Sequence, residues 1–499
     1  MPQSVSPMRN LLIAAAPVAF GLAVPAVAQT TGAPTPLLPP PVQTPPPAAT
    51  VPVPPVAVSV PLPAITAAQA TELARLLGEA RLAHGLRHDA AAAPSASDPA
   101  AVVRAALDYA RAVHAGRLDT SDFQEDWGLR PAAYDPLPAF AEAVKADRLR
   151  AWITRLPPPY AGYDGLQKGL ANYRAIEARG GWRAVPAGPD LAIGAKGPRV
   201  AALRKRLAIE DAEVVATGDS FDATLKEAVQ RAQRRYGLNP TGTVASATLA
   251  QLNVPAGERV RQIMANMERW RWLPKEMPKD RIQVNIAAAL VTVFDGDQPV
   301  MSMRGVTGRP GDETPMLVSS IHSIVLNPPW NVPDGIAKRE LWPKGAGYLK
   351  ANGFRVIENP DGTKRLQQSS EQSALGRYKF DFANPYAVYL HDTPSKATFG
   401  RFDRLASHGC VRLEKPAELA QRLLGADPAW QPEAIQAAVD VGKTVRVKLP
   451  SEVAVYLLYW TAYASSNGAM NFRADPYGWD RTLAAKIEQR SAAQAAIAR

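Results

Sequence analysis

The spacing of apolar residues changes once along this chain, near residue 280, and this change limits the folds that the chain can adopt. Before it, apolar residues such as Leu73 and Leu77 recur at helical intervals. After it, they occupy alternate positions from Ile282 to Ile286, as in a half-buried strand. A chain of 499 residues is also too long for one ordinary core. We therefore predict a multidomain α+β protein in which helical units precede a mainly β domain.

Helix signals dominate residues 65–185. Thr66 and Gln69 match a capping box, and Asp98 followed by Pro99 is typical of a helix start. We interpret residues 65–185 as a helical scaffold domain without a chemical role. A compact three-helix unit is predicted over residues 190–254, where apolar residues at helical spacing follow one another in three short runs.

The first residues have the pattern of an export signal. Arg9 precedes a short apolar run from Leu11 to Val24, and Ala26-Val27-Ala28 matches a small-x-small cleavage site. We predict a signal peptide at 1–28, with an uncleaved membrane anchor as the alternative. Residues 29–64 are rich in proline and are predicted to form an extended linker. No later stretch is apolar for long enough to predict a stable membrane span.

The β domain is expected to cover residues 265–465, with a C-terminal extension at 466–499. Its predicted strands are 282–286, 290–294, 300–306, 317–326, 387–390, 444–449 and 453–458. Residues 327–380 interrupt them with turn formers and aromatic residues, without strand alternation. Long insertions of this kind are usually functional, so we interpret this one as a lid, with a decorated surface loop as the alternative.

The formal net charge of +11 favours an acidic partner. Basic residues are scattered, and no nucleic-acid-binding motif accompanies them, which argues against nucleic acid as the partner. An anionic polymer remains compatible with the charge.

Cys410 is the only cysteine of the chain. Exported proteins usually pair their cysteines, so a lone thiol is either a buried inert group or one kept for chemistry. His391 and His408, two of six histidines, lie within twenty residues of it. A histidine within reach can take the thiol proton and leave a nucleophilic thiolate. Gly409 would let a substrate approach the backbone closely, and amides beside Cys410 could stabilise an oxyanion.

Other interpretations of this segment remain open. Arg412 would lie on the same strand face as Cys410 and could attract a carboxylate. Cys410 could instead be a core thiol, although Ser407, His408 and Arg412 make an apolar niche unfavourable. A zinc site would need three or four ligands, and one cysteine with two histidines lacks the repeated spacing of such sites. His391 could also be a buried structural histidine.

The segment from His391 through Ser407-His408-Gly409-Cys410-Val411-Arg412 resembles the signature of the L,D-transpeptidases, whose catalytic domain is the YkuD type. Residues 190–254 likewise resemble the peptidoglycan-binding-1 module. The resemblance to the L,D-transpeptidases extends over about residues 265–480. As a whole, the chain resembles the large periplasmic subclass, whose catalytic domain carries a substrate-capping loop. This resemblance implies a periplasmic location and the fold already predicted: a helical scaffold, a three-helix module and a mainly β catalytic domain.

The resemblance also implies roles for single residues. Cys410 would be the nucleophile and His391 the proton acceptor and donor, while His408 and Gly409 would shape the oxyanion pocket. The implied substrate-binding residues are Ser407, which would orient the loop, Arg412, Trp330 and Tyr389. No metal or cofactor is implied. His391 is followed by Asp392-Thr393 where smaller members have Gly-Thr or Gly-Ser, so the group that orients His391 is left open.

The implied activity is acyl transfer from a tetrapeptide stem of peptidoglycan to a diaminopimelate amine, which forms a 3→3 cross-link. Two alternatives remain from the sequence: an L,D-carboxypeptidase that uses water as acceptor, and a non-catalytic wall-binding protein. Expected partners are peptidoglycan stem peptides and glycan, with other cell-wall synthesis proteins as candidates. The family also implies that carbapenems acylate Cys410.

Overall fold

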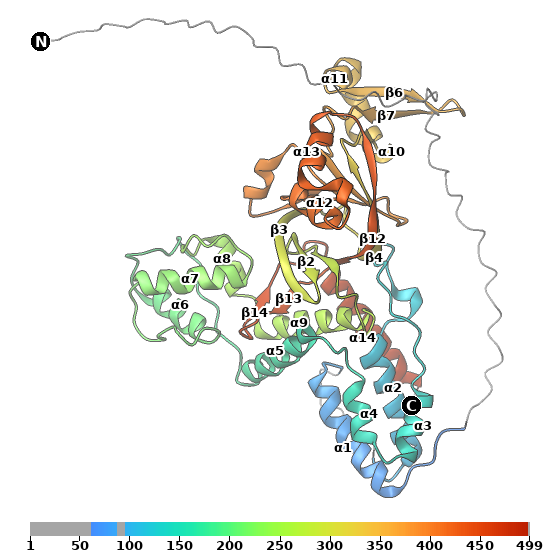
Figure 1. The fold of residues 1–499 in the computed structure, drawn as a ribbon. Coiled ribbons are helices and arrows are strands. Elements are labelled where there is room, and N and C mark those ends of the chain that lie inside the picture. The colour runs from blue at the N-terminus through green and yellow to red at the C-terminus, as the bar shows by residue number, and fades with distance from the viewer. Residues whose placement is uncertain (1–60, 87–94, 498–499) are drawn as a thin grey trace, which may run out of the picture. The chain divides into compact units, whose positions relative to one another are not determined.

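The structure is a computed structural model that describes residues 61–86 and 95–497 (Figure 1). The predicted signal peptide and the predicted linker up to residue 60 lie outside the described residues. Residues 61–64, the end of that linker, have no regular structure. Within the described ranges, no helix is long and apolar enough to span a membrane.

Four helices near the N-terminus pack around an apolar core of their own. They are α1 (Ala67–Ala83), α2 (Pro99–Ala115), α3 (Leu137–Lys145) and α4 (Leu149–Arg155). The Thr66–Gln69 capping box is confirmed, because each side chain bonds to the backbone N–H of the other residue. Asp98 caps α2 as predicted, and Gly116 ends it.

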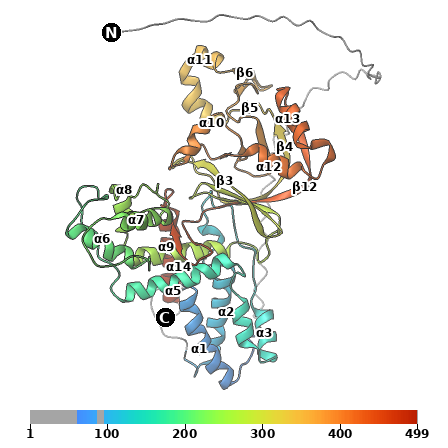
Figure 2. The same ribbon diagram turned by 60° about the vertical axis from the view of Figure 1, so that its left-hand side comes forward.

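The next five helices share a second, larger core with the β domain. They are α5 (Ala161–Ala178), α6 (Pro198–Ala208), α7 (Ala223–Arg235), α8 (Ser246–Leu252) and α9 (Ala256–Arg271). Helices α6, α7 and α8 are the three that the sequence predicts for residues 190–254, and α5 packs along α9 (Figure 2). Helix α9 was not predicted from the sequence, and several of its buried residues are charged or polar.

The β domain is a mixed sheet whose strand pairing closes on itself. Its order is β10-β3-β11-β9-β8-β4-β12-β1-β2, and β2 also pairs with β3. The strands are β1 (Arg281–Asn285), β2 (Leu290–Asp295), β3 (Gln298–Gly308), β4 (Leu317–Leu326), β8 (Tyr378–Phe382), β9 (Leu390–His391), β10 (Leu405–Ser407), β11 (Val411–Leu413) and β12 (Val445–Leu458). Helix α12 (Pro416–Leu424) contacts β8 and β12, and α13 (Pro432–Asp440) follows it. The predicted fold class is confirmed.

Two of the strand predictions were wrong in detail. The strand expected over 387–390 begins only at Leu390, because Ala387 adopts a positive φ of 53° that breaks the extended run. His391 therefore lies within strand β9 and does not follow it. The strands expected at 444–449 and 453–458 form one continuous strand, β12, whose register against β4 shifts between Lys448 and Val453. A bulge absorbs the residues that look like a break in the alternation.

The insertion predicted as a non-strand lid at 327–380 contains a sheet of its own. Strands β5 (Trp330–Asn331), β7 (Lys364–Gln368) and β6 (Phe354–Glu358) pair in that order. Between β5 and β6 lie α10 (Asp334–Ile336), a π-helical turn (Ala337–Leu341), a 3-10 turn (Trp342–Lys344) and α11 (Gly345–Ala351). The insertion also ends earlier than expected, because Tyr378 already starts β8 of the main sheet. The residues of β6 are exposed or half-buried, so no alternation of apolar and polar residues marks this strand in the sequence.

The C-terminal residues pack back on the helices. A hairpin of β13 (Ala462–Ala464) and β14 (Met470–Phe472) contacts α5, α7 and α9, and α14 (Trp479–Ile497) contacts α9. Asp480, at the start of α14, pairs with Arg269 of α9 at 2.5 Å.

Candidate active site

Two neighbouring parallel strands bring the predicted catalytic residues to one face of the sheet. Strand β11 pairs with β9 so that Val411 lies opposite Leu390, and Arg412 lies opposite His391. Val411 and Leu390 are fully buried in the core. Because side chains alternate along a strand, Arg412 and His391 face the other way, as do their second neighbours Cys410 and Tyr389.

The loop before Cys410 is held by bonds within it and by bonds to a neighbouring turn. The Ser407 hydroxyl donates to the Cys410 carbonyl at 2.6 Å and accepts from the Gly409 N–H at 3.2 Å. Thr314 Oγ1 donates to the Gly409 carbonyl at 2.7 Å. Gly409 has a φ of +103°, which strongly favours glycine, and a Cβ there would lie 3.1 Å from the Glu313 carbonyl. Glycine at this position therefore lets the loop close.

The backbone of Asp392 orients His391. His391 Nδ1 hydrogen-bonds to the Asp392 carbonyl, so Nδ1 carries a proton and Nε2 is the basic nitrogen of the neutral ring. The Asp392 carboxylate faces elsewhere. It accepts from the N–H of Arg377 at 2.8 Å, from the N–H of Thr393 at 2.7 Å and from Lys396. The Asp392 side chain thus fixes the turn after β9. Its carbonyl oxygen is the group that orients His391, which the sequence alone did not identify.

Cys410 is partly exposed as a residue, and its thiol is bonded to Tyr389. The Tyr389 hydroxyl bonds to Cys410 and to Trp330 of the insertion, and its ring stands edge-on to His391 at 5.6 Å between centroids. Within the described part of the chain, no hydrogen bond joins His391 to the Cys410 sulfur. The structure therefore brings the predicted base and nucleophile to one face, with Tyr389 in contact with both.

The His391 imidazole and the Cys410 thiol are both neutral near pH 7. Burial, assisted by Arg412, lowers the pKa of His391 to about 3, although hydrogen bonds to the backbone of Asp392 and Leu375 oppose this. Burial also raises the pKa of the Cys410 thiol, against the opposing effects of Tyr389, Lys379 and Arg412. The resting site consequently holds a thiol beside an imidazole and no preformed ion pair.

We expect the alkylation of Cys410 by iodoacetamide to accelerate with pH and to have no plateau between about pH 5 and 8. The reason is that the thiolate forms only by ionisation of a thiol whose pKa lies above the ordinary value of about 8.5. Intact-protein mass measures the rate, and the single cysteine makes the product unambiguous. Glutathione in the same buffers is the control. A plateau at acidic pH would instead reveal a thiolate held by an imidazolium.

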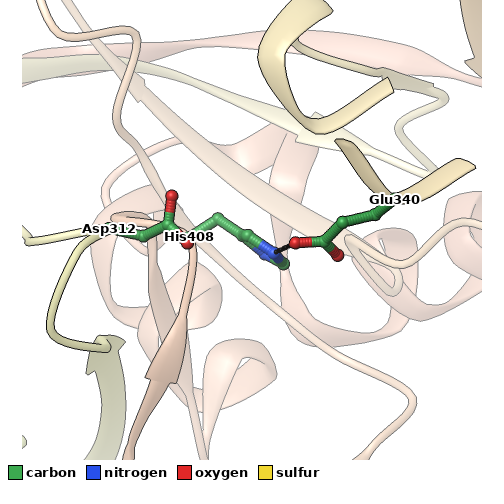
Figure 3. A group of neighbouring side chains, drawn as sticks. All are labelled: Asp312, Glu340 and His408. Atoms are coloured by element: carbon green, nitrogen blue, oxygen red, sulfur yellow. Dashed lines mark hydrogen bonds and ion pairs between the residues drawn. The ribbon is translucent and has the colours of Figure 1, made fainter. Parts of the chain in front are cut away.

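His408 faces the insertion, and its ring is engaged there. Its Nε2 lies 2.7 Å from Glu340 Oε1, and Figure 3 shows this contact together with Asp312. Asp312, Glu340 and His408 are close enough to share a metal ion. Arg309 already pairs with both carboxylates, each at 2.8 Å, and Arg339 pairs with Asp312 at 2.6 Å. These guanidinium groups neutralise the acids, and we assign no metal site here.

The remaining predicted residues lie around the thiol. Arg412 acts electrostatically on both His391 and Cys410. Lys379 of β8 stands over the Tyr389 ring at 4.3 Å and pairs with Asp381 at 2.7 Å. Lys379, Glu340, Arg309 and Asp312 were not among the residues predicted from the sequence. Lys379 left no local signal, because its place opposite His391 depends on the pairing of β8 with β9. Glu340 lies 68 residues from His408, and no local pattern joins them.

Three family models match separate parts of this chain. Residues 279–447 match the L,D-transpeptidase catalytic domain, residues 66–170 a scaffold domain, and residues 196–252 the "Putative peptidoglycan binding domain". A Haemophilus influenzae protein named "Putative L,D-transpeptidase" is 29% identical over 241 residues. That match covers 44% of this chain and 48% of the relative, so the chain spans about half the length of the curated relative that it matches.

Solved structures of L,D-transpeptidases are also similar. One from Stackebrandtia nassauensis is 14% identical, with 55% of this chain and 96% of that chain covered and a TM-score of 0.23. One from Mycobacterium smegmatis is 14% identical, with 36% and 58% covered and a TM-score of 0.20. Such low TM-scores support no argument, whereas the catalytic-domain model matches the residues that hold the His391 and Cys410 motif. Residues 279–447 therefore carry a YkuD-type L,D-transpeptidase catalytic domain.

Proposed function

We propose that this chain forms 3→3 peptidoglycan cross-links by acyl transfer through Cys410. The observation that carries the proposal is the arrangement of four side chains on one sheet face: the partly exposed Cys410, with Tyr389, His391 and Arg412 beside it. The matches to the catalytic domain and to the binding module both support peptidoglycan as the substrate class.

In the first half of the reaction, the Cys410 sulfur attacks the amide carbonyl that precedes the terminal D-alanine of a tetrapeptide stem. The thiol proton moves to Nε2 of His391 as the carbon–sulfur bond forms. The Gly409 N–H is already bonded to Ser407, so we assign the N–H of Cys410 as the oxyanion donor. One such donor contributes about 3 kcal/mol of transition-state stabilisation. The carbon–nitrogen bond then breaks, and D-alanine leaves with the proton from His391.

In the second half, the side-chain amine of a diaminopimelate on another stem attacks the thioester. His391 takes a proton from this amine, the carbon–sulfur bond breaks, and the proton returns to the Cys410 sulfur. The two halves leave the enzyme unchanged. The Asp392 carbonyl keeps Nδ1 protonated, so Nε2 is the nitrogen that exchanges the proton in both halves.

We assign to Arg412 the binding of a substrate carboxylate. Its Nε is buried without a hydrogen-bond partner. Among the described residues no carboxylate forms an ion pair with it. Arg412 is half-buried. A partly desolvated guanidinium without a counter-ion is costly, and a substrate carboxylate would offset that cost. The carboxylate nearest the scissile amide is that of the leaving D-alanine.

The location and the accessory functions belong to the same proposal. We propose that the chain is exported to the periplasm by its first 28 residues, and that the helical module at 190–254 holds glycan near the catalytic domain. Carbapenems, which mimic the acyl donor, would acylate Cys410. Trp330 would contact the substrate from the insertion, because its bond to Tyr389 places it beside the thiol.

Product analysis tests this function directly. Purified protein is incubated with tetrapeptide muropeptides, and the products are separated and weighed by mass spectrometry. We expect 3→3 dimers together with released D-alanine. Tripeptides without dimers would show water as the acceptor and an L,D-carboxypeptidase. Unchanged tetrapeptides, with glycan still bound, would leave only the wall-binding alternative.

A further inference from the structure

The insertion is joined to the catalytic loop by a small ionic cluster. Glu340, on the π-helical turn Ala337–Leu341, places Oε1 2.8 Å from Arg309 and 2.7 Å from His408. Arg339, the residue before it, pairs with Asp312 at 2.6 Å, and Arg309 pairs with Asp312 at 2.8 Å. We call Arg309, Asp312, Arg339, Glu340 and His408 the clasp. Single π-turns inside helices are frequent at functional sites.

The side of the clasp that belongs to the sheet is bonded to the loop that presents the thiol. The Arg309 N–H donates to the Ser407 carbonyl at 3.0 Å. Thr314, at the end of the same turn, donates to the Gly409 carbonyl and accepts from the Gly308 N–H, at 2.7 and 2.8 Å. His408 itself is two residues from Cys410. A movement of Glu340 would therefore reach the thiol loop through short bonds.

The insertion also touches the other side of the site through contacts without formal charge. Trp330 bonds to the Tyr389 hydroxyl, and the backbone of Leu375 bonds to His391. The insertion thus reaches the site from both sides of Cys410, and Glu340 brings a carboxylate to His408. The clasp side chains are partly exposed: Glu340 by 34% and Arg309 by 45%. Such pairs are weak and sensitive to salt, so they can break and reform during a reaction cycle.

We propose that Glu340 is a positioning residue that holds the insertion against the catalytic loop and so limits access to Cys410. Release of the clasp lets the insertion move away and admits a peptide stem; closure brings Trp330 and the loop together around the thiol. The effect of Glu340 on access to the thiol does not depend on which reaction the protein catalyses. The role of Glu340 in acyl transfer rests on the proposed function.

The test is the rate at which iodoacetamide alkylates Cys410 in the full chain, read by intact-protein mass. The reagent is uncharged, and Cys410 is the only cysteine. We expect Glu340→Gln to raise the rate about three- to tenfold, since the substitution removes the partly exposed ion pair with Arg309 and weakens the hydrogen bond with His408. Glu358→Gln is the matched control, because Glu358 is exposed on β6 of the same insertion. An unchanged rate in Glu340→Gln, or an equal rise in the control, would overturn the proposal.

Salt dependence gives a second measurement that needs no variant to fold. The wild-type rate should rise between low salt and about 1 M salt, because screening weakens the clasp. Glu340→Gln should lose part of this dependence, and the remaining part should come from the Arg339–Asp312 pair, which also joins the insertion to the sheet. A wild-type rate that is independent of salt would contradict the inference. Failure to form dimers or tripeptides would refute the proposed function and leave the alkylation result intact.

Discussion

Replacing Cys410 with alanine is expected to abolish two reactions together: the covalent adduct with a carbapenem and the conversion of tetrapeptide stems. The loss should be about 10⁴-fold or more, because the sulfur is the atom that carries the acyl group between the two half-reactions. The adduct is read as a mass increase of the intact protein, and conversion is read as D-alanine release. Both assays report on the same sulfur, so both signals should disappear.

The control separates loss of the nucleophile from loss of the fold. Cys410 is partly exposed and packs only at the edge of the core, and alanine removes a single atom there, so the variant should unfold at nearly the wild-type temperature. Cys410→Ser keeps the shape of the side chain but offers a hydroxyl with a far higher pKa, and we expect only trace activity from it. Substantial turnover by a well-folded alanine variant would remove Cys410 from the mechanism and, with it, the proposed acyl-enzyme.

The local part of the site could be predicted from the sequence. A lone cysteine, two nearby histidines and a glycine lie in one short segment, and strand alternation places Cys410 and Arg412 on one face. The spacing could not reveal that β9 and β11 are direct neighbours, since that pairing depends on the whole strand order. It also could not reveal that Tyr389 contacts both the thiol and the imidazole.

The insertion was hard to predict for a different reason. Its strands β6 and β7 carry mostly exposed or polar residues, so no hydrophobic alternation marks them. Its contacts with the site join residues far apart in the chain, such as Glu340 with His408. Long-range ion pairs of this kind leave no periodic signal. The sequence predicted a lid at this place, but the residues that join it to the catalytic loop came only from the structure.

Helix α9 was missed because its buried face is not wholly apolar. Arg259, Asn266, Glu268, Arg269 and Arg271 are all buried on it. A hydrophobic pattern reads such residues as solvent-exposed, although each is held by partners from other elements. Polar burial of this extent marks helices that are surrounded by other parts of the fold. Among these buried polar residues, Glu268 is the one whose substitution we expect to be strongly destabilising.

Glu268→Ala is expected to lower the free energy of unfolding by about 3–5 kcal/mol, because it leaves two buried guanidinium groups without their carboxylate. Glu268 is fully buried, 2.7 Å from Arg271 and bonded to the side chain and backbone N–H of Arg117. Arg271 continues to the His84 carbonyl at 2.5 Å and to the Tyr163 hydroxyl at 3.1 Å. The cluster thus joins α9 to α5 and to the C-terminal ends of α1 and α2. Urea unfolding followed by tryptophan fluorescence and circular dichroism measures the change.

The matched control is Glu258→Ala on the same helix, where an exposed pair with Arg261 should be worth about 0.5 kcal/mol or less. The difference in unfolding free energy between wild type and Glu268→Ala should also depend on pH. Burial alone would raise the pKa of Glu268, but Arg117 and Arg271 outweigh it and hold the pKa below its ordinary value. Stability from this carboxylate is therefore present above the unfolded pKa of about 4.3 and is lost as the pH falls through the lower folded pKa. The gap between wild type and Glu268→Ala should be widest near neutral pH and should narrow in acid. A gap that stays constant down to acid unfolding would show that Glu268 stabilises the junction by packing and not by charge.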